Sequence, residues 1–339
     1  MKHVTIKDVA KRLNVSVSSV SRAFNDKYDI KKETKELILR TAKEMGYHPN
    51  PIARKLMQQK SYNIGVVVPE FINEFFSETI IGIQDVLISK GYQVLIMQSN
   101  EHYENELMNV KTLSDNMVDG LIVSLSRETH NTEFYLKLLA EGYPIIFFNR
   151  INDSLPASKV IFNDFKWSFF ATEHLIKQGF KKIYHLSGQN HLSLAKNRMK
   201  GFQKAIEKYD MSPEENRVIE TGLLMDEGDK ITQELIDNQD LPEAFSCVND
   251  PVALGAMRAL KRNKIKIPEE VGVVGFTETR LADLVDPSLT SVKQPTYEIG
   301  KTTAELLLKQ INNGFKTPET VSLDGQLNIR ASSVRKTIA

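Results

Sequence analysis

The side chains with the clearest chemistry in this sequence lie between Ser16 and Arg22, where four serines and two valines precede an arginine. A guanidinium group can donate two parallel hydrogen bonds to O6 and N7 of guanine, and a valine can pack on the methyl group of thymine. Serine hydroxyls bond to phosphate oxygens and to base edges. The segment therefore predicts contact with double-stranded DNA. We expect base contacts from Val17, Ser18 and Arg22, and backbone contacts from Thr5, Ser16, Ser19, Ser21 and Asn25.

Three short helices would position these side chains. Thr5 is suited to cap a first helix that begins at Ile6, and Ser16 to cap a second helix over residues 17–24. A third amphipathic pattern covers residues 32–45. Two helices joined by a tight turn, with a supporting third, form a helix-turn-helix, whose second helix enters the major groove. The alternative is an ordinary three-helix bundle with a solvated, serine-rich face.

The charge of the chain is unevenly distributed. Residues 1–60 carry 14 Lys and Arg against 6 Asp and Glu, a balance of +8, whereas the remainder carries a balance of −7. A basic segment next to a larger acidic one favours a polyanion as the partner of the basic segment, because each neutralised phosphate releases counterions. Charge alone leaves open that these are simply solvated helix faces.

The motif is more specific than the charge, because the first 56 residues resemble the lactose-repressor (LacI) family. The helix-turn-helix pattern of that family is matched in register, with Ser19 where threonine is usual, and residues 46–56, GYHPNPIARKL, match its next conserved segment. The resemblance implies sequence-specific DNA binding and transcription regulation, with repression the expected outcome. The matched residues are Thr5, Asp8, Val9, Ala10, Val15, Ser16, Val20, Ser21, Arg22 and Asn25.

Residues 50–60 form a candidate hinge. A helix over 52–59 would be too short to be stable alone, so we expect it to form only when two copies pack together on DNA. In the family that the chain resembles, this helix enters the minor groove and a leucine wedges open the central base step; Leu56 stands at that place. The alternative is an ordinary linker. The expected hinge contacts are Ala53, Arg54, Leu56 and Met57.

From Tyr62 onward, short apolar runs alternate with helical patterns, which is typical of parallel sheets in an α/β fold. A seam near 160–165 and the number of elements predict two doubly wound subdomains with a ligand site between them. The runs are IGVVVP (64–69), QVLIMQ (93–98), GLIVSL (120–125), PIIFFN (144–149), KKIYHLSG (181–188), EAFSCV (243–248) and VGVVGF (271–276).

This part resembles the periplasmic-binding-protein-like sensor of the same family, through RMKGF (198–202), VNDPVALGAMRAL (248–260) and DPSLTSVKQP (286–295). The predicted fold is an all-α helix-turn-helix head joined to an α/β sensor of two parallel-sheet subdomains. We expect the boundaries 1–49 for the head, 50–60 for the hinge and 61–339 for the sensor, with a first subdomain of about 62–160 and 292–315 and a second of about 164–290 and 318–335.

Residues at strand ends and crossovers are the candidate effector contacts. Arg198 matches the family's ligand-binding arginine, and its fork suits paired hydroxyls or a carboxylate. Phe76 could stack on a ring, or lie in the core; Asp250 could accept hydroxyl hydrogen bonds, or cap a helix. The full expected set is Phe76, Asp164, Arg198, Asn249, Asp250, Thr277 and Gln294.

Three departures from the family pattern bear on the effector. Thr277-Glu278 stands where the family usually has an aspartate that binds sugar hydroxyls, Asn149-Arg150 where many members have Asp-Arg, and Trp167 where glycine is frequent. We therefore expect few carboxylates in the cleft, which favours a partly anionic sugar, such as a uronate or a phosphosugar, over a neutral one.

Several classes are disfavoured by what the sequence lacks. It contains no GxSxG, P-loop, HExxH or GxGxxG motif and no spaced histidine pair beside carboxylates, so we expect neither an enzyme nor a cofactor or metal site. Cys247 is the only cysteine, and neither a signal peptide nor a membrane-spanning run is evident, which favours the cytoplasm. The alternatives are a sugar-modifying enzyme with a DNA-binding head, and an architectural DNA-binding protein without a ligand.

The sequence thus predicts a homodimer on a pseudo-palindromic operator, because one helix-turn-helix covers only a half-site. A small, sugar-like effector bound between the subdomains would control the affinity for DNA by preferring one of two states. The C-terminal segment shows no heptad pattern for a tetramerising coiled coil.

Overall fold

The computed structural model describes residues 4–24, 30–47, 60–314 and 317–335. The chain divides into two compact units, one ending at Tyr62 and the other beginning at Asn63. The expected contact residues Asn25, Ala53, Arg54, Leu56 and Met57 lie outside the described residues.

The first unit contains the three predicted helices: α1 (Ile6–Leu13), α2 (Val17–Phe24) and α3 (Lys32–Glu44). The Asp8 carboxylate accepts hydrogen bonds from the Thr5 backbone N–H (2.8 Å) and hydroxyl (2.7 Å), which fixes the start of α1. Asn14 adopts a left-handed conformation and ends that helix, so the chain turns directly into α2. Val9, Val20 and Ile38, one from each helix, are fully buried in a shared core.

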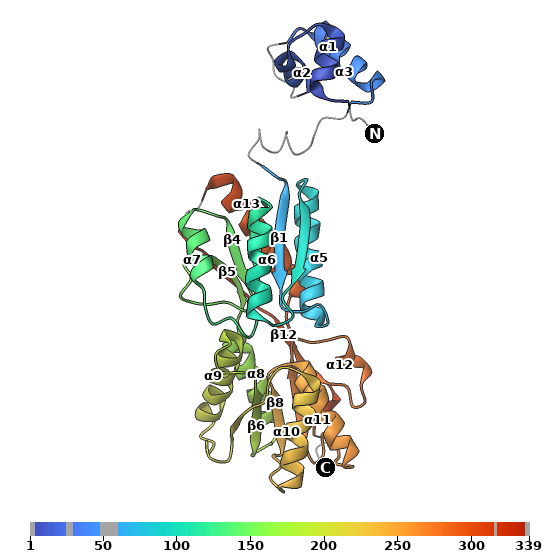
Figure 1. Cartoon of the computed structure of the whole chain (residues 1–339). Coiled ribbons are helices and arrows are strands. Elements are labelled where there is room, and N and C mark those ends of the chain that lie inside the picture. Colours follow the sequence, from blue (N-terminus) through green and yellow to red (C-terminus); the bar gives the residue numbers. More distant parts are fainter. Residues whose placement is uncertain (1–3, 25–29, 48–59, 315–316, 336–339) are drawn as a thin grey trace. The chain divides into compact units, whose positions relative to one another are not determined.

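The second unit is built on two sheets, each flanked by helices on both faces (Figure 1). The first sheet has the order β11-β5-β4-β3-β1-β2, and all its pairings are parallel. Its elements are β1 (Asn63–Val68), α5 (Glu74–Ser89), β2 (Gln93–Gln98), α6 (Tyr103–Asp115), β3 (Gly120–Val123), α7 (Glu133–Ala140), β4 (Ile145–Phe148), β5 (Ser158–Phe162), α13 (Thr296–Asn313) and β11 (Thr320–Leu323).

The second sheet has the order β12-β10-β9-β8-β6-β7, parallel except for the antiparallel pairing of β12 with β10. The chain passes between the two sheets three times, after β5, β10 and β11. The elements are α8 (Asp164–Lys177), β6 (Ile183–Ser187), α9 (Ser193–Lys208), β7 (Val218–Glu220), α10 (Met225–Asp237), β8 (Ala244–Cys247), α11 (Asp250–Arg262), β9 (Gly272–Phe276), α12 (Leu281–Leu284), β10 (Thr290–Lys293), β12 (Gln326–Asn328) and η1 (Ala331–Ser333).

A close backbone contact returns the distant helix α13 to the first subdomain. A Cβ atom at Gly300 would lie 2.0 Å from the carbonyl oxygen of Thr79, so only glycine lets α13 pack this closely on α5. The helix buries Ile299, Leu307 and their neighbours in the core of the first sheet. The last third of the chain therefore completes the subdomain that the first third begins.

One expected boundary is corrected by the sheet pairing. We assigned 318–335 to the second subdomain, but β11 (320–323) pairs with β5 in the first sheet, and only the segment from β12 onward belongs to the second. β10 (290–293) belongs to the second sheet, so the chain returns to the first subdomain after residue 293, close to the expected boundary of about 292. β11 lies at a sheet edge and alternates between exposed and half-buried residues, so it has no continuous apolar run.

Candidate functional site

The helix α2 presents the residues expected to contact bases. Val20 and Ala23 are buried, whereas Val17, Ser18 and Arg22 are exposed. Ser18 and Arg22 stand four residues apart and so lie one helical turn apart on the same side. The structure therefore brings a hydroxyl and a guanidinium group together on the free face of a helix that two others support.

The serines at the start of α2 form a connected cluster. The Ser16 hydroxyl accepts a hydrogen bond from the Ser19 backbone N–H (3.0 Å) and lies 2.7 Å from the Ser18 hydroxyl and 2.8 Å from that of Ser19. The positive end of the helix dipole and these donors suit a phosphate group. Ser21 is half-buried, and the Thr5 hydroxyl is exposed but already bonded to Asp8.

In the sensor, Asp164 and Arg198 form a buried ion pair. Nε and Nη2 of Arg198 lie 2.8 and 2.7 Å from Oδ1 of Asp164, and Nη1 donates to the Val248 carbonyl at 2.5 Å. The guanidinium carbon also lies 3.8 Å from the centroid of the Phe276 ring. Burial raises the pKa of the Asp164 carboxyl, and the neighbouring Arg198 opposes this rise. All three nitrogens of Arg198 thus have partners within the protein.

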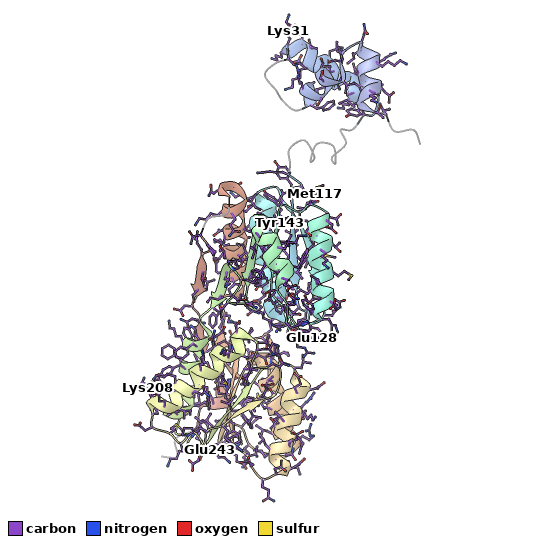
Figure 2. The ribbon with its side chains drawn as sticks, turned by 60° about the vertical axis from the view of Figure 1, so that its left-hand side comes forward. Lys31, Met117, Glu128, Tyr143, Lys208 and Glu243 are labelled. Atoms are coloured by element: carbon purple, nitrogen blue, oxygen red, sulfur yellow. The ribbon has the colours of Figure 1, made fainter. Side chains whose placement is uncertain are left out.

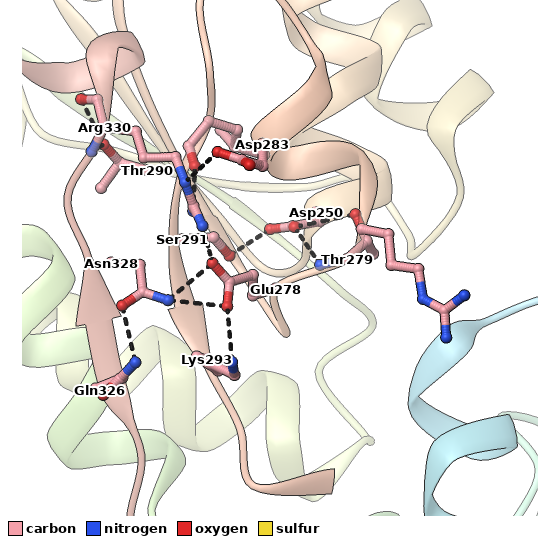
Figure 3. Close-up of polar contacts among 12 residues, drawn as sticks. Asp250, Glu278, Thr279, Asp283, Thr290, Ser291, Lys293, Gln326, Asn328 and Arg330 are labelled. Atoms are coloured by element: carbon pink, nitrogen blue, oxygen red, sulfur yellow. Dashed lines mark hydrogen bonds and ion pairs between the residues drawn. The ribbon is translucent and has the colours of Figure 1, made fainter.

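Asp250 is fully buried at the start of α11 and is held by two neighbours (Figure 3). Its Oδ1 accepts from the Ser291 hydroxyl at 2.5 Å, and its Oδ2 accepts from the Thr279 backbone N–H at 2.8 Å. Burial raises the pKa of Asp250 to about 6. The carboxyl group is therefore fixed in position and can exchange a proton near neutral pH.

The remaining expected residues differ in how many of their side-chain hydrogen-bonding atoms already have a partner within the protein. The side-chain oxygen of Asn249 accepts from the Val252 N–H and its amide nitrogen donates to the Leu223 carbonyl, so both ends are used. Gln294 is buried, and neither of its amide atoms has a hydrogen-bond partner among the described residues. Thr277 is half-buried, with a positive φ of 67°.

Phe76 does not offer an open ring face. It is buried in the first core, with T-shaped contacts to Phe75 and Phe148, and the guanidinium of Arg150 lies over its ring at 5.7 Å. A ligand could stack on this ring only after a rearrangement. Of the two alternatives for Phe76, the structure shows the position in the core, beneath Arg150.

The expected shortage of carboxylates is also corrected. Glu101 lies 2.6 Å from Nη1 of Arg150 and accepts the Arg127 backbone N–H at 2.9 Å, while burial raises the pKa of nearby Glu70. We missed both acids, although Glu70 follows the run 64–69 directly and Glu101 follows the run 93–98 closely. With Asp164 and Asp250, they place four carboxyl groups at strand ends and crossovers.

Glu278 occupies the loop where the family usually has a sugar-binding aspartate, but its carboxylate is bonded to other residues of the protein. Its carboxylate accepts from the Asn328 amide at 2.8 and 2.9 Å and pairs with Arg330, while Lys293 lies 3.9 Å away (Figure 3). It therefore ties the loop after β9 to the crossover strands β10 and β12.

A cavity of about 440 Å³ lies between the two subdomains. Beside the strand ends, several buried polar atoms have no hydrogen-bond partner among the described residues, and each such atom costs about 1–3 kcal/mol if nothing binds it. These atoms are Ser124 Oγ, Arg150 Nε, Ser187 Oγ and both amide atoms of Gln294. The cavity is lined by Glu70, Phe71, Ile72, Gln98, Asn100, Glu101 and Arg127 from the first subdomain and by Leu223 and Leu224 from the second.

Hydrogen bonds across the cleft connect loops of the two subdomains. Nε2 of His191 donates to the Arg127 carbonyl at 2.5 Å, and the Arg280 N–H donates to the Glu74 carboxylate at 2.8 Å. A ligand bound between the sheets would therefore act on two bodies that already touch.

Within the described ranges, no group of three His, Cys, Asp or Glu side chains is arranged to hold a metal ion. None of the helices among the described residues is long and apolar enough to span a membrane.

The exposed face of α2 and the polar cleft define a DNA-binding transcription regulator that is controlled by a small molecule. Comparison with known proteins identifies the family. The model of the bacterial regulatory proteins of the lacI family matches residues 5–50, and that of the periplasmic binding protein-like domain matches residues 172–333. The chain belongs to the LacI family, which confirms the resemblance and the fold inferred from the sequence.

Among its relatives, the ribose operon repressor of Halalkalibacterium halodurans is 33% identical over 308 residues, covering 91% of this chain and 90% of that protein. The lac repressor dimer bound to operator and an anti-inducer superimposes with a TM-score of 0.83 at 25% identity, covering 98% of this chain and 100% of that one. A LacI family regulator of Enterococcus faecium with bound ribose superimposes with a TM-score of 0.72 at 27% identity. The match covers 80% of this chain and 98% of that one.

Proposed function

We propose that this protein represses transcription by binding a pseudo-palindromic operator as a homodimer, and that a sugar in the cleft controls this binding. Three relatives support the proposal: one is a ribose operon repressor, one is a dimer on its operator, and one contains ribose. A single α2 covers only one half-site, so a twofold-symmetric operator calls for two copies.

In this proposal α2 enters the major groove. Arg22 bonds a guanine, Val17 packs on a thymine methyl and Ser18 bonds a neighbouring base, because these side chains share the exposed face. Phosphates are bound by Thr5, Ser16, Ser19, Ser21 and Asn25, and the minor groove by Ala53, Arg54, Leu56 and Met57.

The observation that carries the DNA-binding proposal is the exposure of Ser18 and Arg22 together on α2. It is tested by a salt-series titration on a symmetric operator with a central CG step, compared with scrambled DNA. Arg22→Ala should lower the affinity for the operator by about ten- to a hundredfold and leave the affinity for scrambled DNA nearly unchanged. Equal losses on both DNAs would mean that Arg22 contacts only phosphate.

We further propose that the effector is a neutral sugar rather than an anionic one. Arg198 and Arg150 are each neutralised by a carboxylate, so neither offers an uncompensated charge to an anion. Carboxylates and amide atoms such as those of Gln294 match hydroxyl groups, which both donate and accept. This replaces the anionic sugar that the sequence favoured.

Within the cleft, the proposed contacts with the sugar come from Gln294, Arg150 and the acids of the first subdomain. Asp164, Arg198, Asn249, Asp250 and Thr277 would form the wall of the second subdomain, with most of their bonds made within the protein. Phe76 would support Arg150 from below.

Calorimetry with ribose, other neutral sugars and their phosphorylated forms tests the class of effector. A neutral sugar should bind at least tenfold more tightly than its phosphate ester, and the reverse order would sink this part of the proposal. The factor by which the sugar changes operator affinity must equal the factor by which the operator changes sugar affinity. Measuring both therefore checks that one coupled equilibrium connects the two sites.

We also propose that the protein binds its effector without converting it and acts in the cytoplasm, where it has access to operator DNA. The relatives named above support this, since they are regulators. Nuclear magnetic resonance spectra of the bound sugar should show no product after prolonged incubation; the appearance of a new sugar species would indicate an enzyme.

A further inference from the structure

The outer side of α9 carries a lysine at every fourth position. A spacing of four residues places side chains on one side of a helix, so these lysines form a continuous stripe, and all are exposed. The neighbouring helix α8 adds two phenylalanines with 42% and 37% of their surface exposed. We name this surface the α8–α9 face: Lys196, Lys200, Lys204 and Lys208 on α9, with Phe165 and Phe170 on α8.

The two helices form one surface because their backbones touch. A Cβ atom at Gly201 would lie 2.3 Å from the carbonyl oxygen of Phe165, and the Ser168 hydroxyl donates to the Arg198 carbonyl at 2.6 Å. Nζ of Lys208 lies 5.0 Å from the centroid of the Phe169 ring. Figure 2 shows Lys208 at the outer edge of the second subdomain. At the end of the stripe, Lys208 thus lies beside an aromatic side chain of α8.

The charge of the stripe is only partly balanced. Lys204 pairs with Glu207 at 2.9 Å, and Lys208 pairs with Glu173 at 2.9 Å. Lys196 and Lys200 make no ion pair among the described residues. Like charges four residues apart cost a helix about 0.2–0.5 kcal/mol per pair. An acidic partner would remove this repulsion and gain charge complementarity.

The aromatic side chains are held in place rather than loosely exposed. Phe170 makes edge contacts with Trp167 and Phe169, each with ring centroids 5.6 Å apart, and the Trp167 indole donates to Asp324 at 2.8 Å. Fixed aromatic side chains bordered by positive charge are typical of protein interfaces. The exposed parts of Phe165 and Phe170 favour a protein partner over a phosphate backbone, because apolar side chains of a protein can cover these rings.

We propose that the α8–α9 face docks an acidic, amphipathic segment of another protein. Carboxylates of the partner pair with Lys196 and Lys200, and its apolar side chains cover Phe165 and Phe170. None of these six residues lines the cavity or belongs to α2, so the inference does not depend on the identity of the sugar or the operator.

The test uses the full-length protein and a fluorescent helical peptide of about 20 residues with glutamates on one side and leucines on the other. Binding is followed by fluorescence anisotropy over a salt series. Lys196→Gln with Lys200→Gln should weaken binding by about three- to tenfold and flatten the salt dependence. Phe170→Ser should weaken it by about fivefold or more. The matched control is Lys261→Gln with Lys264→Gln, which removes the same charge from exposed positions at and beyond the end of α11. It should leave the peptide affinity and its salt dependence unchanged.

Four results would overturn the proposal. The first is no saturable binding of the peptide up to about 1 mM. The second is an equal loss in the Lys261 and Lys264 control. The third is a loss of non-specific duplex binding in the Lys196 and Lys200 variant, which would make the face a nucleic-acid site. The fourth is a smaller assembly of this variant in sedimentation without peptide, which would make it an interface between copies. Unchanged circular dichroism spectra show that each variant folds.

Discussion

Each sensor subdomain contains a buried arginine–carboxylate pair at the cleft, but the two pairs are built differently. The side chains of Arg198 and Asp164 are 3% and 8% exposed, and every nitrogen of this arginine has a partner. Those of Arg150 and Glu101 are 5% and 16% exposed, and Nε of Arg150 has none among the described residues. All donors of Arg198 that the structure describes are bonded within the protein, whereas Arg150 has one N–H group, at Nε, that a ligand could accept from. We therefore expect loss of Arg198 to affect stability and loss of Arg150 to affect affinity.

The largest effect is expected from Arg198→Met. This change leaves the Asp164 carboxyl buried without its partner, which costs about 3–5 kcal/mol of the free energy of unfolding. Urea denaturation followed by fluorescence and by circular dichroism measures this loss and checks that both signals change together. Adding Asp164→Asn should recover part of the lost stability, since it removes the uncompensated charge. If the single variant is as stable as the wild type but no longer binds sugar, the assignment of the two pairs is reversed.

A second prediction concerns pH and the same wall of the cleft. Burial raises the pKa of Asp250 from its ordinary value of 3.8 to about 6. A carboxyl group with a raised pKa stabilises the folded state while it is protonated, and this contribution is lost as pH rises through the folded value. The contribution of Asp250 to the free energy of unfolding should therefore fall by about 3 kcal/mol between pH 4 and pH 6 and stay constant above pH 6.

The difference in unfolding free energy between the wild type and Asp250→Asn isolates this contribution, because asparagine does not titrate. Groups whose pKa is lowered, such as Glu173 with a pKa of about 2, change the stability only at lower pH. A difference that stays constant from pH 4 to pH 7 would show that folding does not raise the pKa of Asp250. If a bound sugar strongly shifts the midpoint of this pH dependence, Asp250 contacts the ligand. The residues of the second subdomain then bind the sugar as well as support the fold.

The fold was largely predictable because its signals are local. The cap at Thr5, the serine at the start of α2 and the continuous apolar runs of β1, β3, β4 and β9 each determine an element without distant information. The apolar runs did not predict β5, β7, β10, β11 and β12. The edge strands β7, β11 and β12 are short and partly exposed, and β11 and β12 pair with segments far away in the sequence.

The candidate site was predictable only as a set of positions. Strand ends and crossovers pointed to Asp164, Asp250 and Gln294, and the family resemblance pointed to Arg198. The sequence does not show which hydrogen bonds are already made within the protein. Arg198 illustrates this, since its partners Asp164 and Val248 are 34 and 50 residues away. The roles of Arg150 and Glu101 depend on a pairing across 49 residues, which no local motif indicates.

The smallest of these effects, and the sharpest test of the comparison, is expected from Arg150→Met. Methionine retains apolar contact with the Phe76 ring but removes the free N–H at Nε, and a hydrogen bond to a charged group contributes about 1.5–3 kcal/mol. Affinity for the sugar that binds in calorimetry should therefore fall by about ten- to a hundredfold.

Stability should fall less in this variant than in Arg198→Met, because the Glu101 side chain is more accessible to water and still accepts the Arg127 N–H. Arg150→Lys is the matched control: it retains the positive charge for Glu101 but not the Nε donor, so it should restore stability and leave affinity low. If lysine restores affinity as well, charge rather than a directed hydrogen bond is what Arg150 supplies. The two arginines would then differ in burial alone.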